Sequence, residues 1–153
     1  MVTAMRSTRL GAKVCIIERA FFGGDCLNNG CVPSKAFLKA GQVAKTIKSA
    51  AQFGIKVKAD AIEIDFPAIM QRMRDIRAKI SDNDSAEGFK KFGIDVHLGS
   101  AQFIDAETIE VAGRKVKFNK AVVATGGKPR IPQIPGLDQI EFHTSETIFN
   151  LTE

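Results

Sequence analysis

The chain has 153 residues, an apolar fraction of 44% and a net charge of +5, which is enough material for a domain with a packed core. Its lysines and arginines are interspersed with acids and form no basic stripe among stacking aromatics, which argues against nucleic-acid binding. No apolar run reaches the roughly 20 residues of a membrane span, no signal peptide is recognisable, and the three cysteines are an odd number. We expect a cytoplasmic protein without a membrane segment or a secreted-type disulfide framework.

The first third of the chain predicts a helix, a strand and a second helix. Residues 3–10 fit the last turns of a helix, and Gly11 stands where helices often end in a left-handed residue. The run KVCIIE at 13–18 predicts a buried parallel strand. Beyond a loop with two more cysteines, a helix with Pro33 in its first turn should extend to about residue 52. Its expected apolar face consists of Phe37, Leu38, Gly41, Ala44, Ile47 and Ala51.

The rest of the chain predicts more helix and then short strands. Residues 66–92 are amphipathic with a break at 81–85, which indicates two helices. Short segments between 94 and 118 predict a strand and a small antiparallel meander. The run KAVVATGG at 120–127 predicts a return strand, the most buried of the set, and the proline-rich residues 127–138 predict an irregular crossing.

Cys26 and Cys31 are separated by the four residues LNNG. On a regular helix their Cα atoms would lie about 8.7 Å apart, whereas a disulfide spans less than about 7 Å. Asn28, Asn29 and Gly30 belong to residue types that tolerate turn and left-handed conformations. A bend at these residues can therefore close the pair.

Local charge favours a reactive pair. The helix that follows directs free backbone N–H groups at Cys31, and Lys35 adds a positive charge, so both stabilise a thiolate. A structural bridge and two unpaired thiols stay open as alternatives. A zinc site is less favoured, because the further ligand candidates are Cys15 inside a strand and the isolated His97 and His143.

Two motifs carry a family resemblance. The stretch GGDCLNNGCVPSK at 23–35 resembles the redox-disulfide signature of the class I pyridine nucleotide-disulfide oxidoreductases, flavoenzymes that include dihydrolipoamide dehydrogenase, glutathione reductase and mercuric reductase. The stretch VVATGGKPRIPQIPGLD at 122–138 is similar to the Ala-Thr-Gly motif that ends a flavin-domain strand in this family. Within the family, the serine of VPSK and the leucine of CLN are most similar to the mercuric-reductase-like and dihydrolipoamide-dehydrogenase-like members. The segments GGDCLN, AKISDNDS and TSETIFNL are most similar to the mercuric-reductase-like branch.

The resemblance implies roles for individual residues. Cys26 would be the interchange thiol that attacks the substrate, Cys31 the charge-transfer thiolate against the flavin, and Lys35 an electrostatic support near the flavin ring. Glu18 matches the acid that binds the adenosine ribose, although a surface acid ending a strand is the simpler alternative. The other cofactor-binding positions that the resemblance implies are Gly24, Asp25, Ala101, Thr125, Gly126 and Gly127. Asp25 replaces the threonine that is commonest in the family.

The fold implied is α/β: a Rossmann-like FAD-binding domain with a parallel sheet, helices and a small antiparallel meander. We expect residues 1–153 to be an incomplete domain that lacks the first strand and the phosphate-binding turn, because the sequence contains no Gly-x-Gly-x-x-Gly. The nicotinamide-binding and dimerisation domains of the homodimeric family are also expected to be absent, so the chain alone should bind FAD weakly and not turn over.

In the complete enzyme, electrons would pass from NAD(P)H through FAD and the cysteine pair to a small-molecule disulfide or to Hg(II), as in mercuric reductase. A dihydrolipoamide-dehydrogenase-type fragment stays open as an alternative. So does a cofactor-free thiol–disulfide or interaction module.

Overall fold

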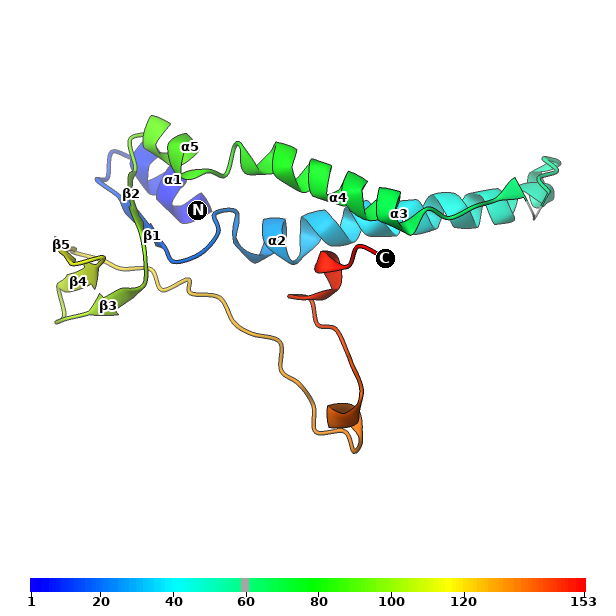
Figure 1. The fold of residues 1–153 in the computed structure, drawn as a ribbon. Helices are drawn as coiled ribbons and strands as arrows, with labels where there is room; N and C mark the ends of the chain where they lie inside the picture. Colours follow the sequence, from blue (N-terminus) through cyan, green and yellow to red (C-terminus); the bar gives the residue numbers. More distant parts are fainter. Residues whose placement is uncertain (59–60) are drawn as a thin grey trace. The chain divides into compact units, whose positions relative to one another are not determined.

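The computed structural model describes residues 1–58 and 61–153, and the chain divides into two compact units. Met1–Gly24 and Ile80–Gly126 make up the first, which we call the sheet unit. Asp25–Lys79 and Gly127–Glu153 make up the second, which we call the helix unit. Figure 1 shows the course of the chain through both units, and each is described by itself.

The sheet unit is built around two parallel strands. Helix α1 (Val2–Arg9) ends before Gly11, whose φ of +87° confirms the predicted left-handed position. Strand β1 (Cys15–Glu18) pairs in parallel with β2 (Asp95–Leu98). Helix α5 (Ala86–Lys91) directly precedes β2, so the predicted order of helix, parallel strand, helix and parallel strand is confirmed for these elements.

The core of the sheet unit lies where these elements meet. Ala4 of α1, Phe89 of α5 and Ile94 are buried together, and the rings of Phe22 and Phe89 are 5.6 Å apart. The half-buried side chains around them are Met5, Val14, Ile16, Phe22 and Val96. Strand β1 is half-buried along its whole length and not fully buried as predicted. Among the described residues its only ladder partner is β2, which leaves its other edge uncovered.

The predicted antiparallel meander is confirmed. Strands β3 (Ala101–Phe103), β4 (Thr108–Val111) and β5 (Arg114–Lys117) form a three-stranded antiparallel sheet. Thr108 and Val111 of the central strand are its buried residues. The meander begins at Ala101, three residues after β2 ends, so it extends from the carboxyl end of the parallel pair.

The prediction of a buried return strand at 120–127 is wrong. No strand is assigned there, and Val122 and Val123 are 71% and 69% exposed. An apolar run becomes a strand only when a neighbouring strand accepts its backbone hydrogen bonds. No strand of the described part of the chain lies beside this run, so its β-branched residues stay extended and exposed.

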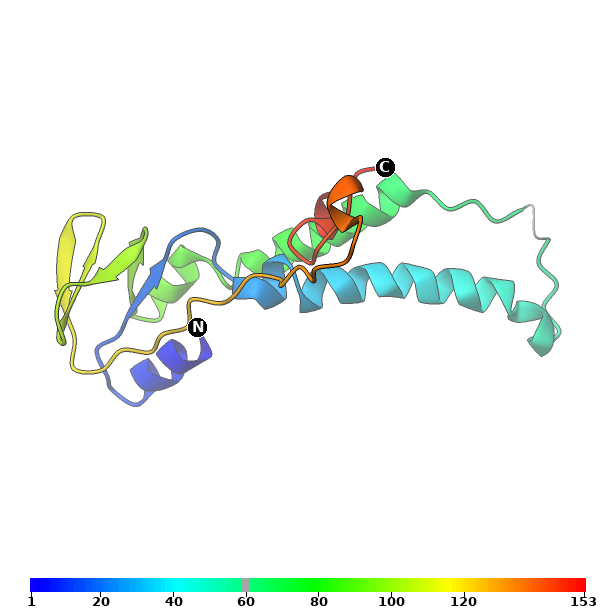
Figure 2. The same ribbon diagram turned by 90° about the horizontal axis from the view of Figure 1, so that it is seen from below.

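The helix unit contains most of α2 (Gly24–Asn28), all of α3 (Cys31–Lys48) and most of α4 (Phe66–Ser81). Helices α3 and α4 run in opposite directions, as Figures 1 and 2 show. Short 3₁₀ turns occur at Ala50–Phe53, Leu137–Gln139 and Ile148–Asn150. The predicted second helix and the break before α5 are therefore confirmed, with the second helix ending in a 3₁₀ turn at about the predicted residue.

The core of the helix unit joins α3, α4 and the C-terminal segment. Ala36, Met70 and Met73 are buried, with half-buried Phe149 and Leu151 against them. The face of α3 that packs agrees only in part with the predicted one. Ala44 and Ile47 are half-buried and the Phe37 ring lies 6.0 Å from the Phe66 ring of α4, whereas Leu38 is 62% exposed. A small residue on α3 leaves room for the two methionines of α4, which fill the contact. No helix in the described ranges is long and apolar enough to cross a membrane.

Candidate redox-active disulfide site

The pair Cys26–Cys31 is closed as a disulfide in the helix unit, with its Cα atoms 4.6 Å apart. Helix α2 ends at Asn28 and α3 begins at Cys31, so Asn29 and Gly30 interrupt the helix between the two cysteines. A continuous helix would hold these Cα atoms about 8.7 Å apart, beyond the reach of a disulfide. The predicted bend is confirmed, and it is what allows the bond.

Gly30 packs tightly inside the bend. A Cβ atom at this position would lie 3.0 Å from the backbone oxygen of Asp25, 3.2 Å from its Oδ2 and 3.3 Å from the Cα of Cys26. Only a residue without a side chain fits there without displacing the backbone beside the first cysteine. Just upstream, Gly23 and Gly24 have φ values of +96° and +62°, which favour glycine in the turn that leads into α2.

Cys31 is the first residue of α3, so Pro33 lies in the first turn of this helix as predicted. The backbone N–H of Ser34 donates to the Gly30 carbonyl at 3.1 Å, and the Ser34 hydroxyl donates to the Cys31 carbonyl at 3.3 Å. The second sulfur atom is thus attached to the positive end of an 18-residue helix. Lys35 is exposed and follows by four residues, so it shares the same side of the helix as Cys31.

Arg77 fixes the end of α2. Its Nη1 atom donates to the Asn28 carbonyl at 3.3 Å, across a sequence separation of 49 residues. This bond connects α4 to the last residue of α2, two positions after Cys26. Arg77 is not among the residues predicted from the sequence, because no local motif marks an arginine that acts across such a separation.

Both cysteines of the bridge are exposed. An exposed disulfide at a helix N-terminus can be reached by an external thiolate or electron donor, and the positive helix end stabilises the thiolate that forms when the bond opens. The third cysteine differs, because burial and the neighbouring Asp95 carboxylate raise the pKa of Cys15 above its usual range. Cys15 is half-buried and unpaired, which fits the prediction that it is not part of the redox pair.

Two of the predicted cofactor positions lie at one edge of the sheet unit. Glu18 ends β1, its register partner Leu98 ends β2, and the Gly99 N–H donates to the Glu18 carbonyl at 2.9 Å. Ala101 follows three residues after Leu98. One carboxylate oxygen of Glu18 accepts from the Ala20 N–H at 2.8 Å. An acceptor carboxylate at the carboxyl edge of parallel strands has the chemistry that binds ribose hydroxyls in dinucleotide sites, so the chemistry of Glu18 is compatible with the role predicted for it.

The remaining predicted positions lie in exposed loop backbone. Thr125, Gly126 and Gly127 are all exposed and outside regular structure, and Gly126 has a φ of +74°. Thr125 and Gly126 belong to the sheet unit, while Gly127 begins the second segment of the helix unit. Gly24 likewise ends the first segment of the sheet unit and Asp25 begins the helix unit.

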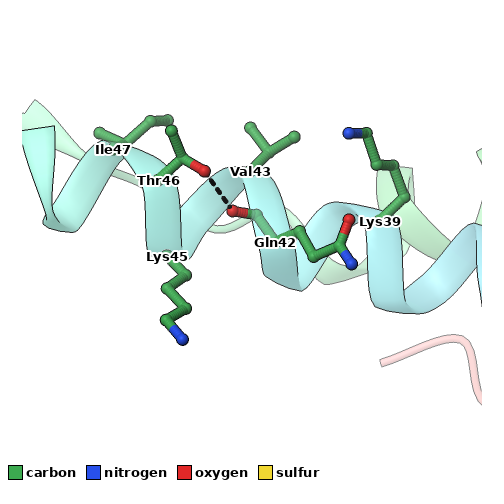
Figure 3. A pocket seen from close by; sticks show the side chains of 6 residues that line it. All are labelled: Lys39, Gln42, Val43, Lys45, Thr46 and Ile47. Atoms are coloured by element: carbon green, nitrogen blue, oxygen red, sulfur yellow. Dashed lines mark hydrogen bonds between the residues drawn. The ribbon is translucent and has the colours of Figure 1, made fainter.

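A shallow pocket on α3 is separate from the disulfide. Figure 3 shows its lining, which comes from a single stretch of helix and includes Lys39 and Lys45, with the Thr46 hydroxyl donating to the Gln42 carbonyl at 2.9 Å. Lys39 lies eight residues after Cys31, about 12 Å along the helix axis. Among the described residues, no group of three or more His, Cys, Asp or Glu side chains is arranged to hold a metal ion.

Comparisons with known proteins agree with this geometry. Residues 1–152 match the family described as pyridine nucleotide-disulphide oxidoreductase. A mercuric reductase from Lysinibacillus sphaericus is 34% identical over 149 residues, which cover 97% of this chain and 27% of the relative. A dihydrolipoyl dehydrogenase from Acholeplasma laidlawii is 35% identical over 138 residues, covering 90% of this chain and 40% of the relative.

A solved structure has the same fold. The HOCl-induced flavoprotein disulfide reductase RclA from Escherichia coli superimposes with a TM-score of 0.73 at 25% identity, covering 99% of this chain and 32% of that protein. The α/β fold prediction is thereby confirmed as a flavoprotein-type, Rossmann-like arrangement. The chain spans between about a quarter and two fifths of the length of these three relatives.

Proposed function

Because the chain belongs to the pyridine nucleotide-disulphide oxidoreductase family, we propose that Cys26 and Cys31 are the redox-active disulfide of an NAD(P)H-dependent flavoenzyme. In this role the pair receives two electrons and passes them to a small-molecule substrate. The observation that carries the proposal is the closed bridge between two exposed cysteines at the first residue of α3.

The family implies FAD as the cofactor, which when bound supplies the two electrons that originate from NAD(P)H. Glu18 would hold the adenosine ribose through its carboxylate, and Ala101 would contribute backbone beside it. The exposed backbone of Thr125, Gly126 and Gly127 would follow the flavin and its ribityl chain. Gly24 and Asp25 would line the cofactor, and the Lys35 ammonium would sit close enough to the flavin ring to stabilise negative charge.

The chemistry of the cysteines follows from their placement. Two electrons and two protons convert the S–S bond into two thiols, and the N-terminus of α3 together with Lys35 favours loss of one proton to give a thiolate. The Cys26 thiolate attacks a substrate disulfide, forms a mixed disulfide and releases one substrate thiolate. Cys31 then attacks the Cys26 sulfur, restores the bridge and releases the second thiol.

Two substrate classes are supported by the relatives. Mercuric reductase is the first candidate, because a 34% identical relative over nearly the whole chain bears that name and because paired thiolates are soft ligands suited to soft metal ions. In that case Hg(II) accepts the two electrons. A dihydrolipoamide-type dithiol–disulfide substrate is the second candidate, supported by the 35% identical dihydrolipoyl dehydrogenase.

The test is a thiol count before and after reduction. The oxidised chain should react with a thiol reagent under denaturing conditions at Cys15 alone, and after treatment with dithiothreitol at three cysteines. Cys26→Ser and Cys31→Ser should each free the other cysteine without reduction. A wild-type count of three before reduction would contradict the proposal, because the pair would then be open under oxidising conditions.

A further inference from the structure

Asp25 is a charged residue directly before Cys26 in the sequence. The reaction steps proposed above do not use its charge. Its Oδ2 atom and the Cα of Cys26 lie 3.2 Å and 3.3 Å from one common point, the position that a Cβ of Gly30 would occupy. Gly30 is bonded to Cys31, the first residue of α3. The Asp25 carboxylate therefore lies beside the backbone of Gly30, next to the N-terminus of α3 and close to the backbone of Cys26.

Positively charged groups also occur near the pair. Lys35 is one turn along α3 on the side of Cys31, and the Arg77 guanidinium of α4 binds the Asn28 carbonyl at the end of α2. The N-terminus of α3 adds partial positive charge at Cys31 itself. The helix N-terminus and Lys35 favour a thiolate once the bridge opens. The negative charge of the Asp25 carboxylate has the opposite effect, because it repels the negative charge of a thiolate that forms nearby.

We propose that Asp25 is a positioning residue that tunes the redox equilibrium of Cys26 and Cys31, its negative charge disfavouring the thiolate state and so lowering the reduction potential of the bridge. The inference deepens the proposed function, since it concerns the same cysteine pair. It does not depend on a bound cofactor, because it is a property of the bridge and its neighbouring charges.

The redox step that the charge acts on can be written in full. A dithiol such as dithiothreitol is oxidised to its cyclic disulfide, and the Cys26–Cys31 bond is replaced by two thiols, with two electrons and two protons transferred. Above the pKa of the more acidic thiol, one proton is released to solvent and a thiolate stays on the protein. Asp25 repels that thiolate and has no charge to repel in the neutral dithiol form.

This difference predicts a pH-dependent effect of Asp25→Asn, which removes the charge and keeps the side-chain shape. At a pH low enough for both thiols to be neutral, the variant and the wild type should have equal reduction potentials. At about pH 9 the variant should be reduced about threefold to tenfold more readily, since a solvent-screened unit charge a few ångströms away has about this effect. That ratio corresponds to a potential about 15 to 30 mV higher.

The measurement uses the full 153-residue chain without added flavin, equilibrated in dithiothreitol buffers and quantified by alkylation and mass spectrometry. Asp25→Glu keeps the charge and should match the wild type. Asp65→Asn is the matched control, because Asp65 also places a carboxylate at a helix N-terminus, accepting from the Ala68 N–H at 2.9 Å in α4. It should leave the potential unchanged at both pH values.

Equal potentials for Asp25→Asn and the wild type at about pH 9 would overturn the inference and leave the proposed function standing. An equal shift at both pH values would also overturn it, because a merely structural role would not depend on thiolate formation. A bridge that dithiothreitol cannot open at all would overturn both the inference and the proposed function.

Discussion

Gly30→Ala should destabilise the Cys26–Cys31 disulfide relative to the reduced dithiol and so raise its reduction potential. The added methyl group would lie 3.0 Å from the Asp25 backbone oxygen and 3.3 Å from the Cys26 Cα, which are closer than ordinary carbon contacts. The backbone at Cys26 must therefore move by a few tenths of an ångström. This crowding is present while the bridge holds the two Cα atoms 4.6 Å apart, and it relaxes when the bridge opens.

The size of the effect follows from the small displacement required. Overpacking costs typically 1 to 3 kcal/mol, and a shift of a few tenths of an ångström beside exposed residues belongs at the lower end, about 1 kcal/mol. About 1 kcal/mol changes the equilibrium with a dithiol about fivefold, which raises the reduction potential by about 20 mV. Because no charge is involved, the shift should be the same at every pH, unlike the one predicted for Asp25→Asn.

The assay is the dithiothreitol equilibration followed by alkylation and mass spectrometry. Gly41→Ala is the control, because Gly41 lies in the same helix and a Cβ there would meet nothing within 4 Å. It should leave the redox equilibrium unchanged and, if anything, stabilise the helix by up to about 1 kcal/mol. An unchanged potential in Gly30→Ala, or an equal shift in both variants, would refute the reasoning about the bend.

Two further predictions concern single contacts. Arg77→Ala should lower the free energy of unfolding, measured by urea denaturation, by about 1.5 to 3 kcal/mol, because it removes a charged hydrogen bond to the Asn28 carbonyl. Arg77→Lys should recover part of the lost stability. An alanine variant as stable as the wild type would show that the bond is unimportant. Cys15 should be alkylated more slowly than an unfolded thiol, because burial and Asp95 raise its pKa. Since the folded pKa is the higher one, folding retains the proton and stability should fall as pH rises through the range where the unfolded thiol ionises. Asp95→Asn should speed the alkylation, and an unchanged rate would contradict the assigned repulsion.

The features predicted correctly from the sequence are those set by neighbouring residues. The end of α1 before Gly11 depends on one left-handed residue. The bend between Cys26 and Cys31 depends on residues lying between them. Such features require only local geometry, so a single sequence is enough to find them.

The errors occur where distant parts of the chain decide the outcome. Val122 and Val123 have the composition of a buried strand, yet they are exposed because the described chain provides no strand beside them. The buried residue of α3 that packs against the methionines of α4 is Ala36, which was not predicted, whereas Leu38 of the predicted face is 62% exposed. Helical periodicity locates α3 correctly but does not choose between its two apolar faces.

The reduction potential of Cys26–Cys31 in the wild-type chain tests the central claim most directly. Structural disulfides typically have potentials below about −300 mV, and exposed, labile or catalytic ones lie above that value. Because both cysteines are exposed and Cys31 is the first residue of α3, we predict a potential above about −300 mV at neutral pH. A potential well below that value would identify the bridge as structural and contradict its proposed role in electron transfer.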